Sequence, residues 1–414
     1  MACKPYILIC AGEDSGDVIG EPLVRALLSE NAAFRNIFVQ GSGGHRMQDA
    51  GMIPLVDFEN LPVSGFGDVL PRYLKLRQSF RILKSALESP ECLGLIAIDY
   101  PGFNMKLVKR AGELHKPALY VAPPQVWAWK RGRAKVLAQN PYVKLAVFFD
   151  FEERAYAEAL CNVVRVKHPF VNSEFGIRIS ELYIEENTSL RGISATAAIS
   201  SQSCLLLPGS RKSQALRNLP VYLNTVANLN QPPESVTIAC ARSELVAPIQ
   251  EFVTDFCNLH CLKNLANVQV VEVPSEISAR RAFFGSYFFA LACPGTATLE
   301  LALSGIPFVV CTKPDLLTYC LGRIFIRTKY FALPNIILGK QVYPEYILGP
   351  FQQCALAKKI DDCLNGTENA HLHGAETCNL KPETSNLHAK LSVGKTLEGL
   401  ALEFLGQFVE CKAQ

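Results

Sequence analysis

The sequence predicts an α/β protein with two Rossmann-like domains, each built on a doubly wound parallel sheet. Two observations carry this prediction. The 414 residues exceed the roughly 250 to 300 that one hydrophobic core usually serves, so two domains are expected. Short aliphatic and β-branched runs alternate with longer helical patterns along the whole chain, which is typical of successive βα units in a parallel sheet.

The first half contains six candidate strands, each a short and continuous apolar run. Such runs are typical of parallel strands that helices cover on both faces. They lie at 6–10, 37–40, 93–98, 118–121, 145–149 and 163–166. Apolar residues at helical spacing separate them and predict helices, most clearly at 18–30 and 105–115.

The second half repeats this alternation. Its candidate strands lie at 204–207, 236–239, 268–271, 287–291 and 308–311. A weakly patterned stretch rich in Ser, Thr and Ala, at 187–203, predicts a boundary loop. We therefore expect a first domain at 1–172 and a second at 173–389. The amphipathic segment within 390–414 then packs either on its own first domain or on a neighbouring copy.

The chain is unusually apolar, with 49% hydrophobic and 19% charged residues and a mean hydropathy of +0.15. The excess is densest at 282–312, where Glu300 is the single charged residue. A membrane helix needs about 20 apolar residues, but Pro294-Gly295 and the Gly-Ile-Pro at 305–307 divide this stretch. We therefore expect a buried strand, a helix and a second buried strand. The N-terminus lacks the apolar run and cleavage site of a signal peptide.

Charge and cysteine placement argue against several kinds of function. The 41 Lys and Arg against 38 Asp and Glu give a net charge of +3, so no nucleic-acid partner is expected. The 15 cysteines are scattered, form no CxxC pair and often lie in apolar runs, which indicates reduced thiols. His371, His373 and Cys378 cluster without a second ligand pair, so no metal site is expected.

Two motifs follow predicted strands of the first half, where open α/β sheets bind ligands. GEDSGD at 12–17 exposes N–H groups that attract anions, or forms an ordinary helix cap through Ser15 or Asp17. Asp99 ends an apolar strand. A partly desolvated carboxylate there suits a general base, although it can also merely brace the following turn.

A third motif, APPQVWAWKRGR at 122–133, contains both tryptophans of the chain. Trp127 and Trp129 stand beside Lys130, Arg131 and Arg133. Aromatic and cationic side chains together suit a phosphorylated or sugar ligand. Hydrophobic packing beside a solvated basic turn is the other interpretation.

Two motifs of the second half suit a nucleotide. Ser210 and Arg211 follow a strand and a Pro-Gly turn, and arginine offers a forked donor set for a diphosphate. Gly295, Thr296 and Thr298 open a helix whose dipole stabilises a nearby anion by about 0.3 to 1 kcal/mol. Glu300, one turn further, either accepts the two hydroxyls of a ribose or faces solvent.

Together these motifs resemble the lipid-A-disaccharide synthases of Gram-negative envelope biosynthesis. The resemblance covers nearly the whole chain, through GEDSGD, GGHRM, VSGFGDVL, IDYPGFN, VWAWKRGR, HPFVN, LPGSRKSQ, PGTATLELAL and YFALPNIIL. It implies a GT-B fold, with two Rossmann-like domains facing across a cleft. It also implies an inverting transfer of 2,3-diacylglucosamine from UDP to 2,3-diacylglucosamine 1-phosphate, without metal or cofactor.

The resemblance further implies residue roles. The first domain binds the acceptor, with Asp99 as the base and Glu13 and Ser15 near it. The second domain binds the UDP-sugar through Gly209, Ser210, Arg211, Gly295, Thr296, Thr298, Glu300 and Asn335, and Trp127 and Arg133 are further substrate contacts. The chain departs from the family pattern at Asp14, Ser64, Gly102, Gln214, Pro294 and Leu348.

The acylated substrates require a surface that faces a membrane. Apolar residues recur through 69–87 at positions 69, 73, 76, 80, 83 and 87, with basic residues around them. This helix either rests on anionic lipid or packs on the core with a solvated basic face. The resemblance implies a cytoplasmic protein at the inner face of the inner membrane, with a second copy as a candidate partner. A UDP-sugar epimerase and a non-catalytic nucleotide-binding module are the competing classes.

Overall fold

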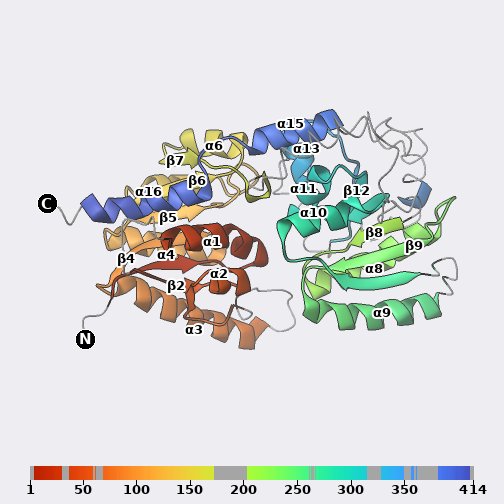
Figure 1. Ribbon diagram of the computed structural model, residues 1–414, viewed down its shortest axis with the longest axis horizontal. Coiled ribbons are helices and arrows are strands. Elements are labelled where there is room, and N and C mark those ends of the chain that lie inside the picture. Colours follow the sequence, from red (N-terminus) through yellow and green to blue (C-terminus); the bar gives the residue numbers. More distant parts are fainter. Residues whose placement is uncertain are drawn as a thin grey trace, which may run out of the picture. The chain divides into compact units, whose positions relative to one another are not determined.

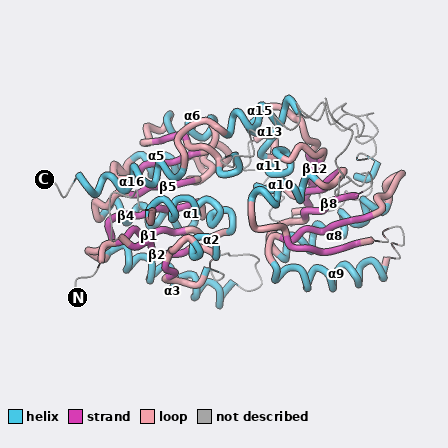
Figure 2. The backbone as a smooth tube through the Cα atoms, in the orientation of Figure 1, coloured by secondary structure: helices cyan, strands magenta, loops and turns pink. Residues whose placement is uncertain are grey.

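The computed structural model describes residues 4–29, 37–58, 61, 69–171, 203–260, 262, 265, 267–314, 328–348, 356–358, 360 and 381–410 (Figure 1). The chain divides into two compact units, Met1–Asn172 with Leu391–Gln414, and Ser173–Lys390. Each unit has its own parallel sheet with helices on both sides (Figure 2). The expected boundary loop at 187–202, the cluster of His371, His373 and Cys378, and Ser64 lie outside the described residues.

The first unit contains a seven-stranded parallel sheet in the order β3-β2-β1-β4-β5-β6-β7. Its strands are β1 (Tyr6–Cys10), β2 (Phe38–Ser42), β3 (Ile53–Pro54), β4 (Cys92–Ile98), β5 (Ala118–Val121), β6 (Val143–Val147) and β7 (Val163–Arg165). Its helices are α1 (Asp14–Leu27), α2 (His45–Asp49), α3 (Val69–Glu88), α4 (Pro101–Glu113), α5 (Gly132–Ala138), α6 (Asp150–Ala157) and α16 (Leu397–Glu410). The strand order reverses between β1 and β4, so a ligand-binding crevice is expected beyond their carboxyl ends.

The second unit contains a six-stranded sheet in the order β10-β9-β8-β11-β12-β13. Its strands are β8 (Ser203–Leu207), β9 (Ser235–Cys240), β10 (Val268–Glu272), β11 (Phe289–Ala292), β12 (Phe308–Thr312) and β13 (Glu345–Ile347). Its helices are α8 (Lys212–Ala227), α9 (Val246–Leu259), α10 (Ile277–Gly285), α11 (Thr296–Leu303), α13 (Leu333–Leu338) and α15 (Lys381–Leu391). Here the order reverses between β8 and β11.

The predicted fold class is confirmed. Every predicted strand is present, and the runs of β1, β5, β8 and β11 are buried throughout, whereas β7 and β10 are mostly half-buried. In β1, for example, Ile7, Leu8 and Ile9 are completely buried. The run predicted at 145–149 corresponds to β6, which ends at Val147. Burial raises the pKa of Cys10 to about 12, which agrees with an inert, reduced thiol.

The apolar stretch at 282–312 folds as predicted, into the strand β11, the helix α11 and the strand β12. Phe289–Ala292 is buried throughout, and in α11 the residues Thr298–Leu303 are all buried. Within the described part of the chain, no helix is both long enough and apolar enough to span a bilayer.

The C-terminal helix α16 completes the first unit by packing on α1. The segment that leads into it runs close to the end of β7, where Lys167 N donates to the Lys395 carbonyl at 2.8 Å. A Cβ on Gly394 would lie 2.3 Å from the Arg165 carbonyl oxygen, so this close approach requires glycine. Lys144 Nζ binds Glu403 at 2.7 Å.

Candidate active site

Asp99 follows β4 at the point where the strand order of the first unit reverses. Its φ is +46° and that of Tyr100 is +49°, two successive left-handed residues. Non-glycine residues adopt this region rarely and at a free-energy penalty of about 1 to 3 kcal/mol, and such strain clusters at functional sites. The surrounding fold must therefore hold the Asp99 backbone in place.

Two side chains hold it, and sequence reasoning named neither for this role. The Asp99 carbonyl accepts a hydrogen bond from Asn104 Nδ2 at 2.9 Å and one from the Tyr120 hydroxyl at 3.1 Å. Asn104 Nδ2 also lies 3.1 Å from the Cys10 carbonyl and 3.0 Å from that of Ile98. Asn104 lies inside α4, fully buried, and ties the ends of β1 and β4 together.

The Asp99 carboxyl group is half-buried, and its environment disfavours the charge. Burial is the larger cause and the nearby Glu13 carboxylate the second; together they raise the pKa of Asp99 to about 6. A carboxylate with this pKa is still ionised at neutral pH and is a stronger base than an ordinary aspartate. The structure thus brings Glu13 and Asp99 together, and the role of Asp99 as a general base stays a prediction.

The GEDSGD segment forms the turn from β1 into α1. Gly12 lies beneath the Tyr100 ring, where a Cβ would be 2.4 Å from a ring carbon, so the two loops pack tightly. Glu13 is the residue before α1, and Ser15 lies half-buried in its first turn. The expectation that Ser15 or Asp17 caps this helix is wrong.

Asp17 makes a different contact. Its carboxylate accepts hydrogen bonds from the N–H groups of Arg46, at 3.1 Å, and Met47, at 3.2 Å. Asp17 therefore stabilises the first turn of α2, which belongs to the GSGGHRM segment, and ties it to α1. Burial raises the pKa of Asp17 despite these bonds.

The tryptophan segment follows β5, beside the Asp99 loop. Trp127 packs inward on the Phe151 ring, with ring centroids 4.7 Å apart. Trp129 is 42% exposed, with Lys130 Nζ 4.5 Å and the Arg133 guanidinium 5.3 Å from its ring centroid. Trp129 is thus the more exposed of the two tryptophans, and the substrate contact predicted for the half-buried Trp127 stays a prediction.

Residues of α6 hold the tryptophan segment in place. The Tyr156 hydroxyl donates to the Pro124 carbonyl at 2.6 Å. Glu152 is buried, accepts the N–H groups of Phe148 and Phe149, and lies near the Trp127 indole N–H, which does not reach full hydrogen-bond geometry. Burial raises the pKa of Glu152 to about 7.

In the second unit, the Pro-Gly-Ser-Arg turn leads from β8 into α8. Gly209 has a φ of +132°, where a side chain is strained. Ser210 and Arg211 are exposed, and Arg211 is the residue before the helix. Buried Asn218 holds the turn, since its Nδ2 donates to the Pro208 carbonyl at 2.7 Å and its Oδ1 accepts the Lys313 N–H at 2.9 Å.

The segment that opens α11 lies beside this turn, because β8 and β11 are neighbours. Gly295 and Thr296 are exposed. Thr298 is fully buried, and its hydroxyl donates to the Gly295 carbonyl at 2.7 Å. Thr298 thus stabilises the turn from within, and its predicted contact with the ligand stays a prediction.

Glu300 is only 8% exposed and does not simply face solvent. Arg280, from α10, binds it with two parallel hydrogen bonds, Nε to Oε2 at 2.6 Å and Nη2 to Oε1 at 2.7 Å. Sequence reasoning did not find Arg280, because it lies 20 residues earlier in an ordinary helical pattern.

Asn335 is fully buried, and the protein itself satisfies its amide. Its Nδ2 donates to the Tyr343 carbonyl and to Glu345 Oε1, both at 2.7 Å, and its Oδ1 accepts the N–H groups of Val342 and Tyr343. Glu345 also accepts the N–H of Ala332 at 2.8 Å. Asn335 therefore braces the segment around α13, and its predicted contact with the sugar nucleotide stays a prediction.

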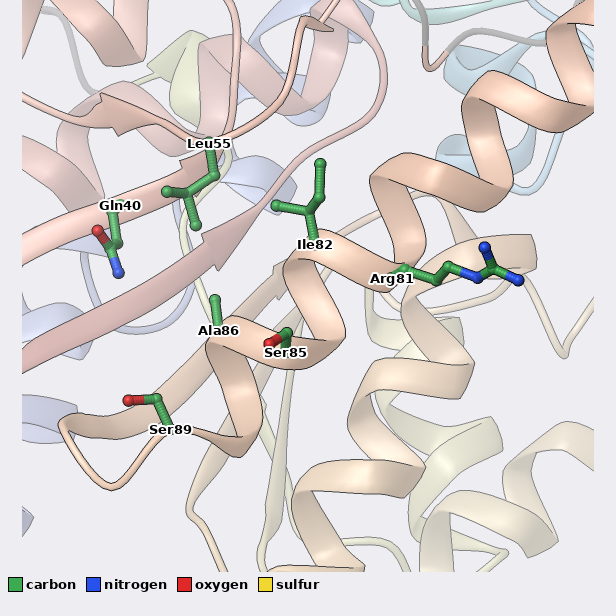
Figure 3. A pocket seen from close by; sticks show the side chains of 7 residues that line it. All are labelled: Gln40, Leu55, Arg81, Ile82, Ser85, Ala86 and Ser89. Carbon is green, nitrogen blue, oxygen red and sulfur yellow. The ribbon is translucent and has the colours of Figure 1, made fainter.

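One groove of the first unit contains none of these site residues. This groove of about 530 Å³ between α3 and the β2–β3 edge is lined by Gln40, Leu55, Arg81, Ile82, Ser85, Ala86 and Ser89 (Figure 3). Among the described residues, no three His, Cys, Asp or Glu side chains gather closely enough to hold a metal ion.

The two doubly wound parallel sheets, with polar loops at the carboxyl ends of their strands, define an α/β protein with two Rossmann-like domains. The family model described as lipid-A-disaccharide synthetase matches residues 7–391. The chain therefore belongs to the lipid-A-disaccharide synthetase family, whose members are glycosyltransferases of lipid A synthesis.

Individual relatives agree with this assignment. A lipid-A-disaccharide synthase of Granulibacter bethesdensis is 28% identical over 93% of both chains. One from Trichlorobacter lovleyi is 33% identical over 82% of this chain and 83% of its own. A third, from Legionella pneumophila, is 29% identical over 94% of this chain and 95% of its own.

Solved structures show the same fold at much lower identity. Staphylococcus aureus MnaA with UDP matches with a TM-score of 0.54 and 10% identity, over 99% of this chain and 97% of that one. The UDP-GlcNAc 2-epimerase of Neisseria meningitidis matches with a TM-score of 0.52 and 12% identity, over 99% and 100%. These likenesses concern the fold alone.

Proposed function

We propose that this chain transfers a 2,3-diacylglucosaminyl group from UDP to the 6-hydroxyl of 2,3-diacylglucosamine 1-phosphate, with inversion at the anomeric carbon. The observation that carries the proposal concerns Asp99. Its backbone is strained and lies at the end of β4, and the pKa of its carboxyl group, about 6, suits a base at neutral pH. Family membership supplies the class of reaction.

In the proposed step, Asp99 takes the proton of the acceptor 6-hydroxyl. The oxygen then forms a bond to the anomeric carbon of the donor as the bond between that carbon and the diphosphate oxygen breaks. UDP leaves with the electron pair. A positioned base contributes about 10²- to 10⁴-fold to such a transfer, and no cofactor is needed to balance it.

The second unit is proposed to hold the donor. Ser210, Arg211 and the turn at Gly209 form an exposed, cationic strand end beside the N-terminus of α11, with Gly295 and Thr296. Arginine and free N–H groups stabilise the charge that develops on the leaving diphosphate. Glu300 is proposed to accept the ribose hydroxyls.

The first unit is proposed to hold the acceptor. Glu13 and Ser15 lie at the turn next to Asp99, and Lys130 and Arg133 flank the exposed Trp129. Arg133 also lies near enough to Tyr120 to lower its pKa electrostatically, against the effect of burial. The cations suit the 1-phosphate of the acceptor, and the indole face suits its sugar ring.

We also propose that α3 contacts the membrane, but not through the predicted apolar stripe. Leu83 and Leu87 of that stripe are completely buried, and Phe80 packs on Phe103 at 5.2 Å. The exposed apolar residues are Leu74, at 59%, and Ile82, at 39%.

Leu74 and Ile82 share one helix face with Arg77 and Arg81, at spacings of three, four, seven and eight residues. An apolar and basic face of this kind suits an anionic lipid surface. We propose, in line with the expectation from the family resemblance, that the enzyme lies peripherally at the inner face of the inner membrane. A homodimer stays a prediction.

The test is a transfer assay with the purified chain, UDP-2,3-diacylglucosamine and 2,3-diacylglucosamine 1-phosphate, with the products identified by mass spectrometry. UDP and a disaccharide 1-phosphate are expected. Asp99→Asn is expected to lose transfer by at least 100-fold while UDP binding persists. The matched control is Asp49→Asn at an exposed position of α2, which should leave turnover unchanged.

Three outcomes contradict the proposal. Isomerisation of the UDP-sugar without acceptor indicates an epimerase. UDP binding without turnover indicates a nucleotide-binding module. Near-normal transfer by Asp99→Asn removes Asp99 as the base.

A further inference from the structure

The strongest contact near the proposed donor site is the pair of Arg280 and Glu300. Both hydrogen bonds of the guanidinium fork are short, at 2.6 and 2.7 Å, and the side chains are 22% and 8% exposed. A bidentate arginine fixes the plane of a carboxylate as well as its position. Arg280 therefore determines where the two Glu300 oxygens point.

Within the described part of the chain, the pair leaves half of the hydrogen-bond accepting capacity of the Glu300 carboxylate unused. Each carboxylate oxygen can accept two hydrogen bonds, and Arg280 uses one on each. One acceptor site per oxygen remains, which matches the two adjacent hydroxyls of a ribose. The residual exposure of Glu300 leaves a path to such a ligand.

The position of Glu300 along α11 also suits a ribose. It lies four residues after Thr296, the first residue of the helix, and thus about 6 Å further along the axis. In a nucleoside diphosphate, the ribose follows the phosphates at a similar distance. Phosphates at the helix N-terminus therefore bring the ribose to the level of Glu300.

A second cation offers Glu300 an alternative orientation. Arg281 lies near enough for the Glu300 charge to raise its pKa, against a larger lowering by burial. Without Arg280, the carboxylate is expected to turn toward Arg281. The charge then stays compensated, but the orientation is lost.

We propose that Arg280 is a positioning residue that orients Glu300 toward the ribose hydroxyls and thereby sets the preference for a ribonucleotide over a deoxyribonucleotide. This inference rests on the proposed UDP-sugar site. Arg280 does not touch the nucleotide in this role; it acts through Glu300.

The test is calorimetric binding of UDP, 2′-deoxy-UDP and 3′-deoxy-UDP to the full chain and to four variants, Arg280→Met, Arg280→Lys, Glu300→Gln and the double variant of Arg280→Met with Glu300→Gln. Arg280→Met is expected to weaken UDP binding about tenfold, as for one lost hydrogen bond to a charged group, and deoxynucleotide binding less than twofold. Arg280→Lys keeps the charge without the fork and should be intermediate. The double variant should discriminate no differently from Glu300→Gln alone.

The result differs if the pair of Arg280 and Glu300 only stabilises the fold and does not orient the carboxylate for a ligand. In that case Arg280→Met lowers the melting temperature and weakens all three nucleotides equally, which overturns the inference. Arg154→Met, which breaks the exposed pair with Asp150 in the first unit, controls for loss of an arginine and should leave discrimination intact.

Failure of the donor site itself is recognisable. If the unmodified chain does not prefer UDP over the deoxynucleotides, or Glu300→Gln leaves that preference unchanged, the proposed ribose contact is wrong. If Glu300→Gln removes the preference and Arg280→Met retains it, the ribose contact holds and the role of Arg280 is wrong.

Discussion

Glu13→Gln tests the electrostatic coupling at the proposed base. The Glu13 carboxylate raises the pKa of Asp99 because two like charges in a half-buried site disfavour each other. Glutamine keeps the shape of the side chain and removes its charge. The pKa of Asp99 should then fall, so that the base stays ionised at lower pH and the acid limb of the pH–rate profile moves down.

The size of this movement follows from the causes of the shift. The pKa of Asp99 lies at about 6 against an ordinary 3.8, which corresponds to about 3 kcal/mol against ionisation. Burial is the larger cause and persists in the variant, so the charge of Glu13 accounts for less than half. We expect the acid limb to move down by roughly half a pH unit to one unit.

The assay is kcat/KM for transfer between pH 4.5 and 8, because this ratio reports ionisations of the free enzyme. Each profile is normalised to its own plateau, so that a lower rate from a weakened acceptor contact does not affect the midpoint. Glu13→Asp retains a negative charge and should keep the acid limb near pH 6. Glu21→Gln, on the same helix but paired with Arg25 and Arg46, should do the same.

Two results refute the reasoning. An acid limb of the unmodified chain near pH 4 means that Asp99 is not the group whose ionisation limits the rate. An unmoved limb in Glu13→Gln, with a normal limb near pH 6, means that burial alone raises the pKa and that Glu13 is not coupled to it.

Three further predictions concern other parts of the chain. Arg211→Ala should raise the donor KM about tenfold, since a hydrogen bond to a charged group contributes about 1.5 to 3 kcal/mol; unchanged donor kinetics would count against its phosphate contact. Serine in place of Arg77, Arg81 and Lys84 together should reduce flotation with anionic vesicles, because each basic residue contributes about 1 kcal/mol there; equal flotation excludes this face of α3. Glu152 has a pKa of about 7, above its ordinary 4.5, so stability is lost as the pH rises between these values; Glu152→Gln should flatten the melting temperature between pH 5 and 8, and an unchanged slope contradicts this.

The sequence was sufficient to predict the sheets because most of their strands are continuous apolar runs, several of them buried on both faces. Runs such as 6–10 and 118–121 leave no polar position, and both match their strands residue for residue. β3 and β13 were missed for the converse reason. Ile53 is 45% exposed, and β13 is short, only half-buried and begins with Glu345, so neither has an apolar run to recognise.

The loops of the site were predictable, but the direction of each side chain was not. Trp127 and Trp129 are two residues apart in one basic motif, yet one packs on Phe151 and the other is exposed. Which of the two tryptophans packs inward depends on contacts with α6, whose residues are not part of the motif. The role of Arg280 could not be predicted from the sequence for the same reason. Its partner Glu300 lies on another helix, and no local sequence pattern connects the two residues.

Asn104 and Asn218 perform the same task in the two units. Each is fully buried and sits on the helix that starts after a strand next to the reversal of strand order. Where the order reverses, the flanking loops diverge and leave strand-end carbonyls without a neighbouring backbone N–H, and a buried carbonyl must still be satisfied. The Asn104 amide satisfies three carbonyls, and the Asn218 amide satisfies the Pro208 carbonyl and the Lys313 N–H. The bonds that complete the two sheets thus also fix the loops of Asp99 and Arg211, so loss of either amide should disturb catalysis or binding as well as stability.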